Sequence, residues 1–132
     1  MPNYSDKRVL VVDDQKSMRG MARYCLTEVG VGAVDSVESA EKAIERMKTV
    51  KYDLIISDWN MDGMSGLDFL KAVRASQAYK DLPFIMATSE RSKELIVAAK
   101  QAGVSHYIVK PFAIDDVRKR LDAVLGKKAA AA

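Results

Sequence analysis

The run Val9-Leu10-Val11-Val12, followed at once by Asp13-Asp14, sets the pattern from which the fold of this chain can be derived. Three further apolar runs also stop at a polar residue: Leu54-Ile55-Ile56 before Ser57-Asp58, Phe84-Ile85-Met86-Ala87 before Thr88, and Tyr107-Ile108-Val109 before Lys110. Short continuous runs of this kind are typical of parallel strands that helices cover on both faces. The carboxyl ends of parallel strands lie at one edge of the sheet, where open α/β sheets bind ligands. We therefore expect three carboxylates, one hydroxyl and one ammonium group to converge at that edge.

Helical patterns alternate with strand patterns along the whole chain. Strands are expected at about 8–13, 33–34, 53–58, 84–88 and 107–110, and the first two helices at 17–29 and 39–50. The third helix is expected after the N-cap Ser65, the fourth is expected to close at Gly103, and the last to end before Gly126. The connections are too long for hairpins, so five βα units in a parallel sheet with right-handed crossovers follow. The chain is expected to be one domain, with a core at about 8–126 and a frayed tail at 127–132.

The composition excludes several classes of protein. With 132 residues, 48% of them hydrophobic and 30% charged, the chain has the size and composition of one soluble domain. Its net charge of +3 is scattered, which does not favour nucleic-acid binding. Neither a membrane span nor a signal-peptide core is visible, so we expect no membrane association and a cytoplasmic location. One cysteine, Cys25, and one histidine, His106, exclude an internal disulfide and a zinc cluster.

Carboxylates at two of the strand ends suggest a metal site. Asp13 and Asp14 follow the first strand directly, and Asp58 ends the third. Neighbouring carboxylates repel one another, and a hard cation such as Mg²⁺ would neutralise them. Aspartate carboxylates accept phosphoryl groups when a metal ion and a cationic side chain hold the group, and Lys110 and Thr88 supply the ammonium and the hydroxyl. One strand-end Asp alone would suit a helix cap, but the full set favours Mg²⁺ with a phosphoryl group.

The order and spacing of these residues resemble a known family. Asp13-Asp14, Asp58, Thr88-Ser89 and Lys110-Pro111-Phe112 are similar to the motifs of the receiver domain of response regulators, over about residues 8–126. The resemblance implies a five-stranded parallel sheet of the doubly wound, flavodoxin-like type. It also implies phosphorylation of Asp58 by a histidine kinase or a phosphotransfer protein, in a Mg²⁺-dependent reaction.

The resemblance further implies a role for each site residue. Asp14, Asp58 and the backbone carbonyl of Asn60 would hold Mg²⁺, and Asp13 would act largely through water. Thr88 and Lys110 would bind the phosphoryl oxygens. Thr88 and Tyr107 would form the switch, Asn60 and Glu90 would tune hydrolysis of the phosphoryl group, and the Lys110–Pro111 peptide would be cis.

Two residues depart from the pattern of the family. Asp62 stands where receivers commonly have proline, which loosens a rigid turn and adds negative charge near the site. Ser65 replaces an Asp that often opens the following helix, and Ser caps nearly as well. Asp62 therefore bears on metal affinity and on the lifetime of the phosphoryl group, whereas the helix should be unaffected.

The stretch Asp58-Trp59-Asn60-Met61, with no output domain attached, is most similar to the stand-alone receivers of chemotaxis. We expect a monomer that catalyses only its own phosphorylation and dephosphorylation and that signals to a downstream protein, with the flagellar motor switch as the expected target. The alternatives are a phosphate sink, a phosphorelay intermediate or a regulator of a kinase. An aspartyl phosphatase is disfavoured because its D-x-D pair is absent from the first strand, and a flavin carrier because Asp14 would repel the flavin phosphate.

Overall fold

The computed structural model describes residues 3–89 and 93–131. Within them, strands and helices alternate as the apolar runs predict. The elements are β1 (Arg8–Val12), α1 (Lys16–Val29), β2 (Ala33–Val37), α2 (Ala40–Met47), β3 (Leu54–Asp58), α3 (Gly66–Ala75), β4 (Phe84–Thr88), α4 (Lys93–Gln101), β5 (His106–Val109) and α5 (Ile114–Ala131). In these residues, no helix combines the length and the apolar character that crossing a membrane would require.

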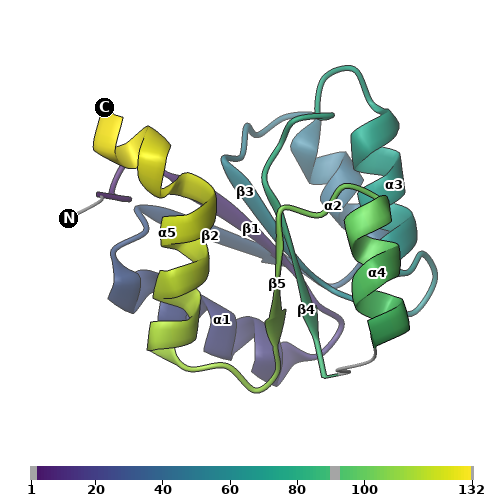
Figure 1. Ribbon diagram of the computed structural model, residues 1–132, viewed down its shortest axis with the longest axis horizontal. Helices are drawn as coiled ribbons and strands as arrows, with labels where there is room; N and C mark the ends of the chain where they lie inside the picture. Colours follow the sequence, from purple (N-terminus) through teal and green to yellow (C-terminus); the bar gives the residue numbers. More distant parts are fainter. Residues whose placement is uncertain (1–2, 90–92, 132) are drawn as a thin grey trace.

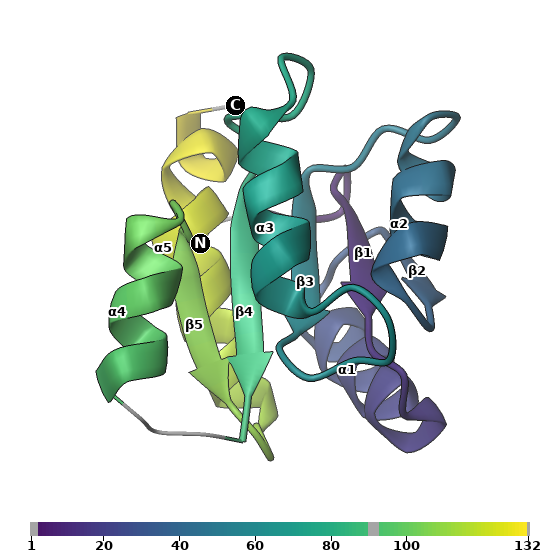
Figure 2. The ribbon, with the colours of Figure 1, turned by 90° about the vertical axis from the view of Figure 1, so that its right-hand side faces the viewer.

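All five strands pair in parallel, in the order β2-β1-β3-β4-β5. Helices α1 and α5 cover one face of the sheet, and α2, α3 and α4 cover the other (Figure 1). The view from the side shows the same three layers, with α2, α3 and α4 in front of the sheet and the strand arrows pointing to one lower edge (Figure 2). The predicted fold, a doubly wound parallel sheet of five βα units, is confirmed.

Two hydrophobic cores, one on each face of the sheet, hold the layers together. Along β1 the buried side chains alternate between the cores: Val9 and Val11 pack with α1 and α5, and Leu10 and Val12 pack with α2, α3 and α4. This alternation follows from the two-residue repeat of a strand. Because both faces of β1 are buried, its sequence is a continuous apolar run rather than an alternating one.

Side-chain caps and glycines set several helix ends where the sequence places them. The Ser65 hydroxyl accepts a hydrogen bond from the Asp68 amide at 3.1 Å, which confirms its predicted role as N-cap of α3. Gly30 ends α1 in the left-handed conformation, with φ 105°, and its amide donates to the Leu26 carbonyl. Gly103 also has a positive φ just after α4. Glycine adopts this conformation without the steric cost that a Cβ would impose.

The structure corrects several predicted boundaries. β1 ends at Val12, which leaves Asp13 in the following turn, and α2 ends at Met47, because Lys48, Thr49 and Val50 form turns bonded back to the helix. Helix α5 continues through Gly126 to Ala131, so the helix end predicted before Gly126 is wrong. The segment expected to be a frayed tail is helical as far as Ala131. Lys and Ala are strong helix formers, and one glycine costs a helix only about 1 kcal/mol.

Candidate functional site

Four strand ends meet at one edge of the sheet and bring the predicted site residues together. β3 lies between β1 and β4, and β5 follows β4, so Asp58 at the end of β3 has Asp13 on one side and Thr88 on the other. Backbone bonds continue the pairing past the strands: the Trp59 amide donates to Ala87 and the Lys110 amide donates to Thr88. Residues far apart in sequence thus share one small volume.

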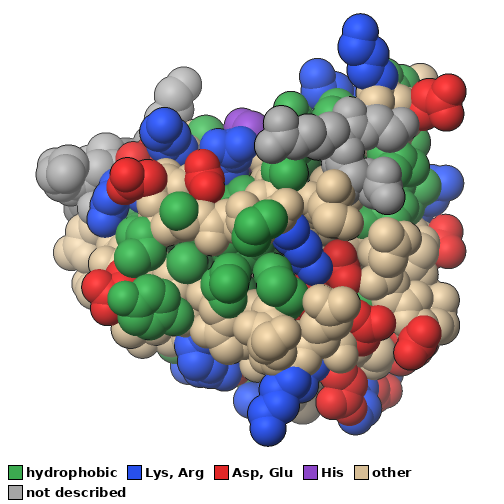
Figure 3. All heavy atoms as spheres, turned by 90° about the horizontal axis from the view of Figure 1, so that it is seen from below, with side chains coloured by type: hydrophobic (Ala, Val, Ile, Leu, Met, Phe, Trp, Pro, Cys, Tyr) green, Lys and Arg blue, Asp and Glu red, His purple; other side chains and the backbone are tan. Residues whose placement is uncertain are grey.

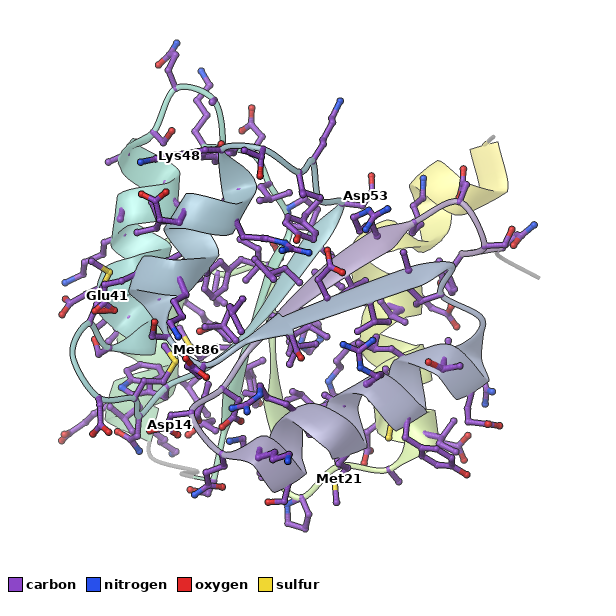
Figure 4. All side chains as sticks on the ribbon, turned by 180° about the vertical axis from the view of Figure 1, so that it is seen from behind. Asp14, Met21, Glu41, Lys48, Asp53 and Met86 are labelled. Carbon is purple, nitrogen blue, oxygen red and sulfur yellow. The ribbon has the colours of Figure 1, made fainter. Side chains whose placement is uncertain are left out.

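Three carboxylates gather at this edge. Asp13, Asp14 and Asp58 each place one carboxylate oxygen within 4.8 Å of the others. Asp13 and Asp58 are buried, whereas Asp14 is exposed and lies at the lower edge of the molecule (Figure 4). Like charges at this separation destabilise one another unless a cation compensates them.

Lys110 supplies part of that compensation. Its ammonium nitrogen lies 2.7 Å from Asp13 Oδ2 and 3.0 Å from Asp58 Oδ1. Burial by itself lowers the pKa of Lys110, but its hydrogen bonds to Asp13 and Asp58 outweigh burial and raise the pKa above its ordinary value. Lys110 is therefore a fixed positive charge between two carboxylates. With all three carboxylates ionised, two negative charges are left for another cation.

The pKa of Asp58 is also raised, but here burial outweighs the bond to Lys110. Burial raises its pKa, and the charges of Asp13 and Asp14 add to that rise, while the hydrogen bond to Lys110 opposes it. Because the ionised form of Asp58 is poorly solvated, an added cation beside it would stabilise that form. The Asp58 carboxylate is also less shielded from an electrophile than a surface carboxylate would be.

Both the side chain and the backbone of Asp13 are hydrogen-bonded. Its Oδ1 accepts a hydrogen bond from the Gln15 amide at 2.9 Å, and its Oδ2 accepts from Lys110. Its carbonyl accepts from Arg19 Nη1 at 2.8 Å, and its amide donates to Val37 at 3.1 Å. With both carboxylate oxygens engaged in this way, Asp13 is less available than the exposed Asp14 to bind a metal directly.

The remaining predicted residues are placed as follows. Thr88 is buried at the end of β4, and Asn60 is exposed in the loop after β3. Tyr107 is half-buried in β5 and packs against the core on the α4 side. Glu90 lies outside the described residues. The Lys110–Pro111 peptide is cis, as the resemblance implies.

The donor set fits Mg²⁺. Mg²⁺ is a hard cation that takes oxygen ligands, usually one or two carboxylates with waters completing the shell. The three clustered groups are all carboxylates, and no sulfur or imidazole ligand belongs to the cluster among the described residues. The exposure of Asp14 and the loop position of Asn60 leave one side of the cluster accessible to water and to a phosphoryl oxygen.

Two residues at the site were missed by sequence reasoning. Arg19 bonds to the backbone of Asp13, yet an arginine on a helix normally indicates only a solvated face. The second is Gly66, whose amide donates to the Trp59 carbonyl at 2.8 Å. A Cβ at Gly66 would lie 2.2 Å from the Asp58 carbonyl, so the start of α3 packs directly on the backbone of Asp58. The sequence signal for this contact was a glycine directly after the N-cap Ser65, where a helix has no need of one.

The loop that contains Asp62 is held by a neighbouring helix. Asp62 is exposed, and Gly63 beside it has a left-handed φ of 78°. Glu41 of α2 approaches the same loop, and its Oε2 lies 3.5 Å from the Met64 amide. The loop has a defined path without the proline that receivers commonly have there.

Of two hollows in the surface, one lies far from this site and the other reaches it at Lys110. A groove of about 570 Å³ lies between residues 47–53 and 77–83, near the amino ends of β3 and β4. Lys48 and Asp53, which line it, lie at the end of the molecule opposite Asp14 (Figure 4). A second hollow of about 470 Å³ includes Tyr107 and Lys110. Seen from the lower edge of the molecule, hydrophobic side chains gather on the side of α1 and α5, with acidic side chains around them (Figure 3).

Comparison with known proteins agrees with this geometry. The model of the response regulator receiver domain matches residues 9–122. Chemotaxis protein CheY-3 of Vibrio cholerae is 38% identical over 117 residues, which cover 89% of this chain and 90% of that protein. Chemotaxis protein CheY of Pseudomonas aeruginosa is 34% identical over 89% of this chain and 94% of its own length. The solved structure of Vibrio cholerae CheY4 at low pH has a TM-score of 0.84 and 37% identity, and covers 90% of this chain and 98% of that one. On the match of the family model and of these relatives, the chain belongs to the response regulator receiver domain family.

Proposed function

We propose that Asp58 is phosphorylated by the phosphohistidine of a histidine kinase or of a phosphotransfer protein, in a reaction that requires Mg²⁺. The observation that carries the proposal is the convergence of the three carboxylates with Lys110, whose ammonium lies between Asp13 and Asp58. Three ionised carboxylates with one ammonium group leave two negative charges that Lys110 does not neutralise, and the cluster is open on the side where a donor would arrive.

In the proposed reaction, an oxygen of the ionised Asp58 attacks phosphorus, and the bond from phosphorus to the histidine nitrogen breaks. The nitrogen keeps the bonding electron pair and takes up a proton. When bound, Mg²⁺ supplies charge neutralisation for the transferring group. Lys110 favours the ionised form of Asp58 before the transfer. Afterwards its ammonium group pairs with a phosphoryl oxygen, and the Thr88 hydroxyl donates a hydrogen bond to another.

The donor would dock on the face around the start of α1. Met21 on this helix is 39% exposed and lies at the same edge of the molecule as Asp14 (Figure 4). Figure 3 shows a hydrophobic area at this end of the molecule, on the side of α1 and α5. Burial of such a surface gives a donor protein affinity and places its phosphohistidine over Asp58.

The output would be a change in the face formed by α4, β5 and α5. The hollow of about 470 Å³ on this face is lined by Ile96 of α4, Tyr107 of β5 and Arg120 of α5, and also by Lys110. Lys110 thus belongs both to the phosphorylation site and to the wall of this hollow. We propose that phosphorylation moves Thr88 and Tyr107 and so changes the affinity of this face for a downstream protein. The similarity to CheY proteins favours the flagellar motor switch as that protein.

Trp59 fluorescence tests the proposed function. This residue is the only tryptophan, is 9% exposed and directly follows Asp58. We expect one change in fluorescence on adding Mg²⁺ and a second on adding an acyl phosphate, with the mass rising by one phosphoryl group per chain. Asp58→Asn should lose the second change and the added mass.

Asp53→Asn is the matched control, because Asp53 is a carboxylate at the opposite edge of the sheet and should label as the native chain does (Figure 4). Labelling of Asp58→Asn at the native level would exclude Asp58 as the phosphoacceptor. Labelling that proceeds equally well in excess chelator would exclude the metal requirement.

A further inference from the structure

Arg19, on the first turns of α1, is bonded to the residue at the centre of the site. Its Nη1 donates to the backbone carbonyl of Asp13 at 2.8 Å, in a partly buried position. A hydrogen bond from a guanidinium group is charge-assisted, and such bonds are shorter and about twice as strong as neutral ones. The carbonyl concerned belongs to the peptide that joins Asp13 to Asp14, so this bond acts on both members of the acidic pair.

The orientation of that peptide decides where the two carboxylates point. On the Asp13 side, the amide is bonded to Val37, and the carboxylate is bonded to Gln15 and Lys110. On the Asp14 side the chain enters the exposed turn before α1, and the bond from Arg19 holds the shared peptide plane. Loss of this bond removes one restraint on the plane, so we expect the Asp14 carboxylate to be held less firmly near Asp58.

We propose that Arg19 is a positioning residue for the metal site, acting through the Asp13–Asp14 peptide without touching the ion. Because a metal ion at this site is part of the proposed function, the role of Arg19 rests on that function as well. Partners that orient metal ligands in this way affect affinity strongly, and their loss typically costs 10- to 100-fold.

Arg23 provides a matched control one helical turn further on. Its Nη1 donates to the Val34 carbonyl at 2.7 Å, so it makes the same kind of bond, from the same helix to a backbone carbonyl of the sheet. Val34 lies in β2, an edge strand that contributes none of the clustered carboxylates. Replacing either arginine removes one guanidinium–carbonyl bond made from α1, and Arg23→Ala also removes a long contact of Nη2 with Ser36 Oγ at 3.4 Å. Only Arg19 is bonded to the acidic pair.

The test is a Mg²⁺ titration of Trp59 fluorescence in the full chain, for native protein, Arg19→Ala, Arg19→Lys and Arg23→Ala, with urea unfolding of each. We expect Arg19→Ala to raise the Kd for Mg²⁺ about tenfold and Arg23→Ala to leave it within about twofold. The two alanine variants should lose similar amounts of stability. Arg19→Lys keeps the charge and one donor, and should recover part of the lost affinity; it also provides the measurement if Arg19→Ala does not fold.

The outcomes separate this role from the proposed function. Native affinity in Arg19→Ala, or in Arg19→Lys if that is the only folded variant, would overturn the role of Arg19 and leave the metal site standing. An equal loss of affinity in Arg23→Ala would also overturn it, because the effect would then come from loosening α1 in general. No response of the native chain to Mg²⁺ would overturn both the metal requirement and the role of Arg19.

Discussion

Asp58 is a buried carboxylate among other carboxylates, and its surroundings decide how this residue responds to pH. Burial and the charges of Asp13 and Asp14 raise its pKa, although Lys110 opposes the rise. A group whose pKa is higher in the folded than in the unfolded chain binds protons more tightly when folded. Ionised Asp58 therefore destabilises the folded chain, which is the cost of keeping a reactive carboxylate in this position.

Asp58→Asn should accordingly be more stable than the native chain at neutral pH, by about 1 kcal/mol. The ordinary pKa of Asp is about 4, so the destabilising effect of Asp58 is absent below that pH and develops as the pH rises toward the folded pKa. The gain in Asp58→Asn should thus be present at pH 7 and shrink as the pH falls toward 4. Urea unfolding at several pH values measures it, with exposed Asp81→Asn as control. A less stable Asp58→Asn at pH 7 would mean that the pairing with Lys110 outweighs burial.

At the scale of single elements, α3 begins in contact with the backbone of the site. Ser65 caps the helix, and Gly66 then packs so closely that a Cβ would lie 2.2 Å from the Asp58 carbonyl. The helix thereby fixes the end of β3, which carries Asp58. This close approach requires glycine for its lack of a side chain, because the φ of Gly66 is not positive.

Gly66→Ala should therefore destabilise the chain by about 2 kcal/mol or more, since the clash is with backbone and neither partner can move away easily. It should also weaken the response of Trp59 to Mg²⁺. Gly20→Ala in α1 is the matched control, because a Cβ there would meet nothing within 4 Å. A glycine in a helix interior costs up to about 1 kcal/mol relative to alanine, so this control should be stabilised. Thermal unfolding of both variants measures the change in stability. Equal stabilisation of the two variants would contradict the close contact at Gly66.

At the scale of the whole molecule, Lys110 connects the carboxylate cluster to the face formed by α4, β5 and α5. It bonds to Asp13 and Asp58 at one end and lies directly after β5 at the other. On the same face, Arg120 of α5 donates to the Tyr107 carbonyl at 3.0 Å, which ties α5 to β5. A change in charge at Asp58 can therefore reach this face through β5, a contiguous element.

Lys110→Arg should fold normally but separate phosphorylation from the change in this face. The planar guanidinium group does not reproduce a compact ammonium placed between two carboxylates. Amide NMR shifts after addition of acyl phosphate should extend to Val97 in α4 and Tyr107 in β5 in the native chain. In Lys110→Arg they should stay near Asp58, even where mass spectrometry finds Asp58 phosphorylated. Spread of the shifts to α4 in that variant would exclude Lys110 as the connection.

The sequence by itself determined the elements, the parallel sheet and the edge at which the polar strand ends meet. These features follow from local patterns: apolar runs of strand length, helical repeats between them, and a polar residue at the end of each run. Several predicted boundaries failed, and the largest difference is the helix end expected before Gly126. A glycine penalty of about 1 kcal/mol did not outweigh the helix-forming lysines and alanines that follow.

Only the tertiary structure decided which residues at that edge contact one another. Three contacts depend on how the helices pack on the sheet. They are the bonds of Lys110 to Asp13 and Asp58, the bond of Arg19 to the Asp13 carbonyl, and the contact of Gly66 with the Asp58 backbone. Lys110 and Asp13 are 97 positions apart in the chain, and no local pattern carries a distance across such a separation. The raised pKa of Asp58 has the same origin, because burial and the placement of neighbouring charges exist only once the layers have packed.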